Sequence, residues 1–150
     1  MKSVMLALFF SLVLVSAVPA ADDLVTLRSS HDVRTTADRL EKALLDKGMK
    51  IFLRIDQAAA AQSVGRELRP TELVVFGNPK IGVPLMQCSQ KVAIDLPQKA
   101  LIWEDETGQV WFSYNAPDYI VKRHAISGCG EVIDKLQEAL GNFAGAATSP

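Results

Sequence analysis

The chain is poor in the residues that build metal centres and nucleophilic active sites. Its 150 residues include only two histidines and two cysteines. It contains no Gly-x-Ser-x-Gly elbow, no phosphate-binding Gly-Lys-Ser/Thr loop, no Gly-x-Gly-x-x-Gly fingerprint and no His-Glu-x-x-His. These absences argue against the common serine hydrolases, NTPases, dinucleotide-dependent enzymes and zinc proteases. We expect neither a bound metal nor a cofactor.

An excess of basic charge is also missing. The chain carries 16 Lys and Arg against 17 Asp and Glu, for a formal net charge of −1. Nucleic-acid-binding proteins need a basic surface to neutralise phosphates, so we do not expect a nucleic-acid partner. No repeat or low-complexity block divides the chain, and residues 21–150 are therefore expected to form a single domain.

The one long apolar run lies at the N-terminus. Lys2 precedes an almost wholly apolar stretch from Val4 to Val15, and Val18-Pro19-Ala20 offers small residues for cleavage. This pattern is typical of a secretory signal peptide, residues 1–20, and the run is shorter than the roughly 20 apolar residues that a membrane span needs. We therefore expect a periplasmic or secreted protein with no stable membrane anchor after cleavage.

Cys88 and Cys129 are interpreted in the light of that export. Disulfides form and persist in oxidising compartments, which makes this pair a disulfide candidate. Two other interpretations are open. The cysteines could be buried free thiols, or they could hold a soft metal together with Met86 and His124. Their spacing matches no standard zinc pattern.

Hydrophobic periodicity predicts strands between two long helices. The predicted strands are Leu24–Leu27, Lys50–Asp56, Glu72–Phe76, Lys99–Glu104 and Gln109–Asn115, the third of them buried on both faces. The predicted helices begin at Val33, Gln57, Pro117 and Gly130, and Gly82 and Pro84 predict a short or broken helix between Pro79 and Ser89. The last helix is predicted to end at Asn142, before a frayed tail from Ala144. This order predicts an α+β fold with a mostly antiparallel sheet packed against two long helices.

Candidate binding residues flank the third predicted strand. Asn78 is a good N-cap for a helix that starts at Pro79, and Lys80 would lie beside free backbone N–H groups, which suits an anion. Thr71 lies in the turn before this strand. Asp56 and Asp95 each end an apolar segment, where capping is the favoured role. The alternative is that they act as acid and base.

Three aromatic residues lie on the strands of a predicted hairpin around Asp105–Gly108. Trp103, Trp111 and Tyr114 could line a ligand groove. Aromatic residues on hairpins more often form cross-strand core pairs, and that interpretation is favoured.

Several blocks of sequence, in the same order, resemble one family. They are Ile55-Asp56, Leu68–Glu72, Phe76–Lys80, Pro84–Gln87, Asp95–Pro97, Lys99–Asp105, Tyr114-Asn115 and Arg123-His124. Together they resemble the domain of unknown function 302 family over most of residues 21–150. The resemblance implies a β-α-β4-α fold with a TATA-binding-protein-like topology, often as a homodimer, and it implies no reaction. Gln57 stands where family members often carry His, so an acid–base or metal role of that His is not expected here.

We favour a non-catalytic binding or stress-related protein with an unknown small-molecule ligand. Its site would lie near Asp56, Thr71, Asn78, Lys80 and Asp95, with Trp103 and Tyr114 as walls. One alternative is a homodimeric interaction module without a pocket, in which the sheet or residues 79–89 form the contact. The other is a small hydrolase or isomerase that uses Asp56 or Asp95 as a base.

Overall fold

The computed structural model describes residues 23–150, and the predicted signal peptide lies outside the described residues. Within residues 23–150, five strands form one antiparallel sheet in the order β1-β5-β4-β3-β2. The strands are β1 (Leu24–Arg28), β2 (Lys50–Asp56), β3 (Thr71–Gly77), β4 (Gln98–Glu104) and β5 (Val110–Asn115). Each predicted strand is confirmed to within one residue at either end, because alternating side chains and turn residues mark strand limits locally.

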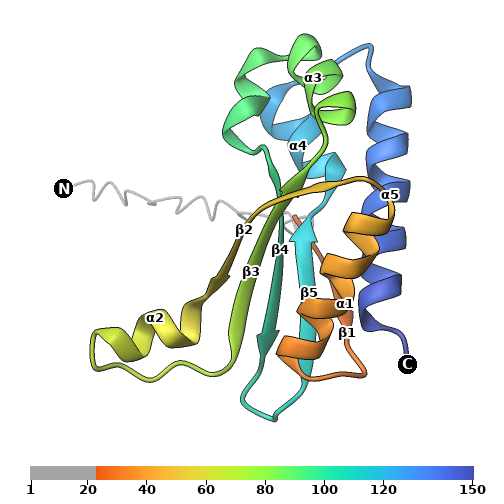
Figure 1. The fold of residues 1–150 in the computed structure, drawn as a ribbon. Helices are drawn as coiled ribbons and strands as arrows, with labels where there is room; N and C mark the ends of the chain where they lie inside the picture. Colours follow the sequence, from red (N-terminus) through yellow and green to blue (C-terminus); the bar gives the residue numbers. More distant parts are fainter. Residues whose placement is uncertain (1–22) are drawn as a thin grey trace, which may run out of the picture.

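Helices cover one face of this sheet, and shorter helices lie beyond its two ends. They are α1 (Val33–Asp46), α2 (Gln57–Ser63), α3 (Pro79–Cys88), the 3₁₀ helix η1 (Gln90–Ile94), α4 (Pro117–His124) and α5 (Gly130–Thr148). The long helices α1 and α5 pack on the same face, α3 and α4 lie beyond one end of the sheet, and α2 projects from the other end (Figure 1). The predicted α+β class is confirmed. The finer TATA-binding-protein-like topology stays an expectation, as does the homodimer.

The core lies between the sheet and the two long helices. Inward-facing strand residues alternate with residues of the open face, as the two-residue period of a strand requires. The buried side chains include Val74, Phe76, Ala100, Ile102 and Phe112 from the sheet, and Leu40, Leu44, Leu136 and Leu140 from the helices. The prediction that the third strand is buried on both faces is wrong, because Leu73 and Val75 are only half-buried.

The edge strand β2 is joined to α1 by a cluster of charges around Arg54. Its guanidinium lies 2.5 Å from Glu72 and from Asp38, and 3.1 Å from Glu41. These hydrogen bonds hold the pKa of Arg54 above its usual range, and the hydrogen bond to Glu72 has the largest effect. Arg54 therefore stays charged and holds the helix against the edge of the sheet.

The helix α5 continues past the predicted frayed tail to Thr148. Ala144 and Ala147 are completely buried, and Arg39 of α1 donates hydrogen bonds to the carbonyl oxygens of Ala146, Ala147 and Ser149. Small side chains allow α5 to approach α1 closely, and Arg39 satisfies carbonyls that the end of a helix would otherwise leave unpaired.

The helix α3 is a continuous helix of ten residues, and not the short or broken one that was predicted. Pro84 removes one backbone donor from its interior but does not end it. Its last residue, Cys88, is disulfide-bonded to Cys129, the residue that precedes α5, with the two Cα atoms 6.4 Å apart. The disulfide therefore joins the end of α3 to the start of α5.

Within residues 23–150, none of the helices combines the length and the apolar character needed to cross a membrane.

Candidate functional site

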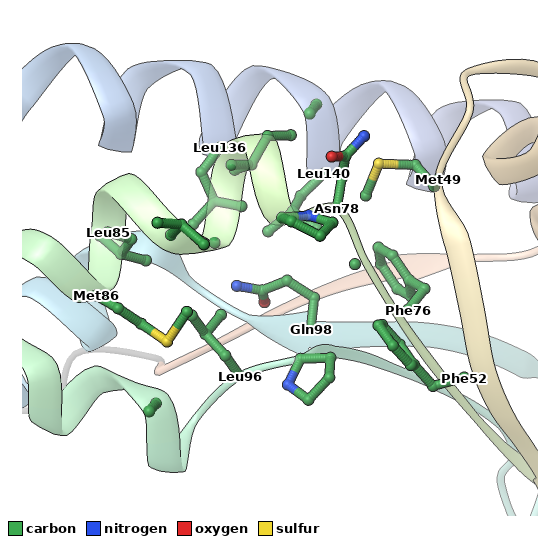
Figure 2. A pocket seen from close by; sticks show the side chains of 18 of the residues that line it. Met49, Phe52, Phe76, Asn78, Leu85, Met86, Leu96, Gln98, Leu136 and Leu140 are labelled. Atoms are coloured by element: carbon green, nitrogen blue, oxygen red, sulfur yellow. The ribbon is translucent and has the colours of Figure 1, made fainter.

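A pocket of about 310 Å³ opens between α3 and α5, at the end of the sheet where β3 finishes and β4 begins. Figure 2 shows its apolar side chains arranged around the side chain of Gln98. The wall from α3 includes Ile81, Leu85 and Met86, the wall from α5 includes Leu136, Leu140 and Phe143, and Met49, Phe52, Phe76 and Leu96 complete the lining. Phe76 and Phe143 pack edge to face, with ring centroids 6.2 Å apart.

The local sequence explains how α3 comes to cover this end of the sheet. β3 ends at Gly77, where a Cβ atom would lie 3.4 Å from the ring of Phe52 and 3.5 Å from Pro97. Asn78 then caps α3 by accepting a hydrogen bond from the backbone N–H of Lys80 at 2.9 Å, with Pro79 as the first helical residue. The predicted cap is confirmed, and it starts the helix directly above the end of the strand.

Small residues on both helices leave the pocket its volume. Gly82 of α3 and Ala139 of α5 line it, and neither carries a side chain beyond Cβ. Around them, methionine and leucine side chains can adjust their rotamers to fit an irregular apolar ligand.

Gln98 is the unusual residue of this pocket. It is only 6 % exposed, and its Nε2 atom is buried without a hydrogen-bond partner among the described residues. Its side chain extends into the ring of apolar side chains (Figure 2). An unpaired buried amide lowers the stability of the fold by about 1–3 kcal/mol, so the requirements of folding alone do not explain a glutamine at this position.

The other polar lining residue, Asn78, already has partners. Its Oδ1 caps α3 as described, and its Nδ2 donates to the carbonyl oxygen of Gly48 at 3.4 Å. No charged side chain among the described residues lines the pocket. Gln98 is therefore the polar group there that a ligand could satisfy.

Two of the predicted site residues lie close to the pocket without lining it. Lys80 is exposed on the first turn of α3. Asp95 directly precedes Leu96 of the lining, and its carboxylate contacts His124 Nε2 at 2.5 Å and Arg123 Nη1 at 3.5 Å. Asp95 thereby ties the segment before β4 to α4, which is a positioning role.

Asp56 and Thr71 lie at the opposite end of the sheet. Asp56 pairs with Glu72 at the start of β3, whereas Gln98 pairs with Phe76 near its end. Glu72 and Phe76 are four residues apart along β3, which corresponds to about 13 Å at about 3.3 Å per residue. Asp56 accepts the backbone N–H of Ala59 at 2.8 Å and caps α2, as predicted. The structure therefore does not bring Asp56 and Asp95 together as an acid–base pair.

The aromatic residues of the hairpin face opposite sides of the sheet. Trp103 and Trp111 are direct cross-strand partners with ring centroids 6.5 Å apart, which confirms the predicted pairing but places it on the open face and not in the core. Tyr114 lies on the helix-covered face, where burial raises the pKa of its phenol. Trp103 and Tyr114 therefore do not wall a common groove, since the strand period puts them on different faces.

Gln98 was not predicted as a site residue, because the fourth strand was expected to begin at Lys99. One signal was available. Gln98, Ala100 and Ile102 recur with a period of two, which places Gln98 at an inward-facing position of the strand. A glutamine in that position marks a buried polar group. The residues contributed by α5 carry no comparable local signal. Among residues 23–150, no three His, Cys, Asp or Glu side chains are grouped to hold a metal ion.

Comparison with known proteins identifies similarity at the level of sequence and of fold. The family described as "Domain of unknown function DUF302" matches residues 25–143. Proteins described as "Fluoride-specific ion channel FluC 1" from Brucella suis biovar 1 (strain 1330) and Brucella abortus biovar 1 (strain 9-941) are each 41% identical over 112 residues, or 75% of this chain. The match covers 44% and 42% of those proteins, so the chain spans less than half the length of these curated relatives.

A solved structure shares the fold. The crystal structure of an uncharacterized conserved protein DUF302 from Bacillus stearothermophilus superposes with a TM-score of 0.76. The match covers 85% of this chain and 99% of that chain, at 18% sequence identity. This similarity supports the arrangement of strands and helices described above, and at that identity it carries no information about a ligand.

Proposed function

Because the chain belongs to the family described as Domain of unknown function DUF302, which comes without an activity, we propose a function from the pocket itself. The protein binds a small, predominantly apolar molecule and does not transform it. The supporting observation is an apolar pocket of about 310 Å³ that contains one buried amide nitrogen without a hydrogen-bond partner among the described residues. An apolar cavity of about 150 Å³ is enough to hold benzene, so this pocket has room for roughly two fused rings, and a further ring of a ligand can extend through its opening between α3 and α5.

The chemistry of the lining supports binding rather than catalysis. Its described residues include no Ser, Cys, His, Lys, Asp or Glu that could serve as a nucleophile, general acid or general base. Two carboxylates directly precede lining residues in the sequence. Asp95 is engaged by His124 and Arg123, and Glu138 is exposed on α5. The pocket thus offers shape, apolar contact and the N–H groups of one unpaired amide nitrogen among the described residues.

The name of the Brucella relatives gives weaker support for any particular ligand of this pocket. Fluoride is a small, strongly hydrated anion, which needs cations or several N–H donors to replace its water. The pocket has no charged lining residue among those described and one unpaired amide nitrogen. We therefore do not extend fluoride binding to this pocket.

Export is part of the proposal, on the strength of the apolar N-terminal run and its small-residue cleavage site. Expression of the full chain in a Gram-negative host is expected to yield a periplasmic protein whose intact mass is that of a chain starting at Ala21. A full-length mass confined to the cytoplasm would contradict export.

Filling the pocket is expected to abolish binding of an apolar probe. In Ala139→Phe the new ring projects from α5 into the pocket that Ala139 lines. We expect the affinity for N-phenyl-1-naphthylamine, followed by its fluorescence in apolar surroundings, to fall at least about tenfold, equivalent to about 1.4 kcal/mol. A thermal unfolding curve checks that the variant is folded.

Asn142→Phe is the matched control, since Asn142 is an exposed residue of the same helix outside the lining. It is expected to bind the probe as the wild type does. The proposal fails if the wild type does not bind the probe, or if Ala139→Phe binds it as tightly as Asn142→Phe does.

A further inference from the structure

We propose that the ligand of this pocket is an uncharged apolar molecule with a carbonyl oxygen, and that Gln98 selects it by donating a hydrogen bond from Nε2. This inference rests on the proposed function, because it names the chemical class that the same pocket takes. Its starting point is the buried, unpaired Nε2 atom at the first residue of β4.

The position of Gln98 makes it a recognition group and not a surface residue. It shares the inward face of β4 with Ala100 and Ile102, both completely buried, and its own exposure is 6 %. Leu85, Met86, Leu136 and Leu140 surround its amide in Figure 2, and none of these side chains accepts a hydrogen bond of ordinary strength. A carbonyl oxygen brought in by a ligand would supply the acceptor that the protein withholds.

The absence of charge along the described lining argues that the ligand is neutral. A carboxylate held there would lose its water without gaining a cation, at a cost of several kcal/mol. Lys99 follows Gln98 but lies on the other face of the strand, and its Nζ donates to the carbonyl oxygens of Asp95 and Pro97, both at 3.0 Å. Lys80 is exposed on α3. Neither lysine is a lining residue.

A hydrocarbon of the same shape would fill the pocket equally well but would leave the amide of Gln98 buried without a hydrogen-bond acceptor. A neutral hydrogen bond is worth about 0.5–1.5 kcal/mol net, so we expect the carbonyl compound to bind about 3- to 10-fold more tightly. The selectivity is thus a difference between two ligands of equal size, which can be measured directly.

The test uses three naphthalenes that differ only in one substituent. They are 2-acetylnaphthalene with a carbonyl group, 2-isopropenylnaphthalene with a C=CH₂ group of nearly the same shape, and 2-naphthoate with a negative charge. Their affinities are measured by displacement of N-phenyl-1-naphthylamine. In the wild type, we expect the ketone to bind about 3- to 10-fold more tightly than the alkene, and naphthoate to bind most weakly.

Two variants place the selectivity on one residue. Gln98→Met keeps the length of the side chain and removes the donor, so the ratio of ketone to alkene affinity is expected to fall to about one. Asn142→Phe is the control, because Asn142 is exposed on α5 and lies outside the lining. Its ratio is expected to stay at the wild-type value.

The outcomes separate the inference from the proposed function. If the probe binds but the wild type does not distinguish the ketone from the alkene, or if naphthoate binds most tightly, the ligand class is wrong and the pocket remains a binding site. The same holds if the probe binds and none of the naphthalenes displaces it, or if Gln98→Met keeps the ratio. If the probe itself does not bind to the wild type, the proposed function fails as well.

Discussion

Removal of the Cys88–Cys129 disulfide is expected to lower the free energy of unfolding by about 4 kcal/mol, because the chain-entropy model assigns that value to a loop of this length. The two cysteines are 41 residues apart in the sequence. In the unfolded chain the bond restricts the ends of this loop, and without it the unfolded state gains conformational entropy. For a domain of this size, the melting temperature is expected to fall on the order of 15 °C.

The disulfide also acts on the pocket. Cys88 ends α3, Cys129 precedes α5, and these two helices form the two main walls of the pocket. Opening the bond leaves the end of α3 held by the apolar contacts of residues such as Leu85. We therefore expect weaker binding of N-phenyl-1-naphthylamine in addition to lower stability.

Urea denaturation of the wild type, with and without a thiol reductant, measures this effect beside the double variant Cys88→Ala/Cys129→Ala. The reductant should destabilise the wild type and leave the double variant unchanged. Equal unfolding free energies of the oxidised wild type and the double variant would contradict a structural disulfide in the folded protein.

Gln98→Met is expected to stabilise the protein by about 1–3 kcal/mol while it removes the preference for a carbonyl ligand. Most polar-to-apolar changes at buried positions break a hydrogen bond, but the Nε2 atom of Gln98 has none to lose among the described residues. Its replacement by a side chain of similar shape relieves the desolvation penalty. A residue that costs stability and serves binding is typical of a functional site.

The matched control for this change is Gln109→Met. The Nε2 atom of Gln109 donates to the carbonyl oxygens of Val110 at 2.7 Å and Ser29 at 3.1 Å. The same substitution there removes both hydrogen bonds. The Val110 oxygen still accepts the backbone N–H of Ser29 at 2.8 Å, and we expect a loss of about 1–2 kcal/mol. Chemical denaturation of both variants gives the two signs. A destabilised Gln98→Met would show that its amide is paired in the folded protein, and would remove the basis for ligand selection.

Much of the fold was predictable because its signals are local. The strands have alternating side chains and end at turn residues, and the caps Asp56 and Asn78 act within three residues of themselves in the chain. The end of α5 was not predictable in this way. It depends on contacts with Arg39 of α1, more than a hundred residues earlier in the chain.

The candidate site was harder to predict for the same reason. Of the seven predicted binding residues, only Asn78 lines the pocket. The pocket arises where α3 and α5 pack over the end of the sheet, and no local pattern reports that contact. Asp95 likewise meets His124, which lies 29 residues further along. That Trp103 and Tyr114 lie on opposite faces could have been predicted. Trp111 and Tyr114 are three residues apart on one strand and so face opposite sides, and Trp103 is the cross-strand partner of Trp111.

The most direct test of the pocket is a two-dimensional ¹H–¹⁵N NMR titration of the protein with 2-acetylnaphthalene. We expect shifts in α3, α5 and the start of β4, together with a downfield shift of the Gln98 side-chain N–H resonances as they gain an acceptor. Shifts confined to the open face around Trp103 and Trp111, or no saturable shifts at all, would contradict a ligand pocket between α3 and α5.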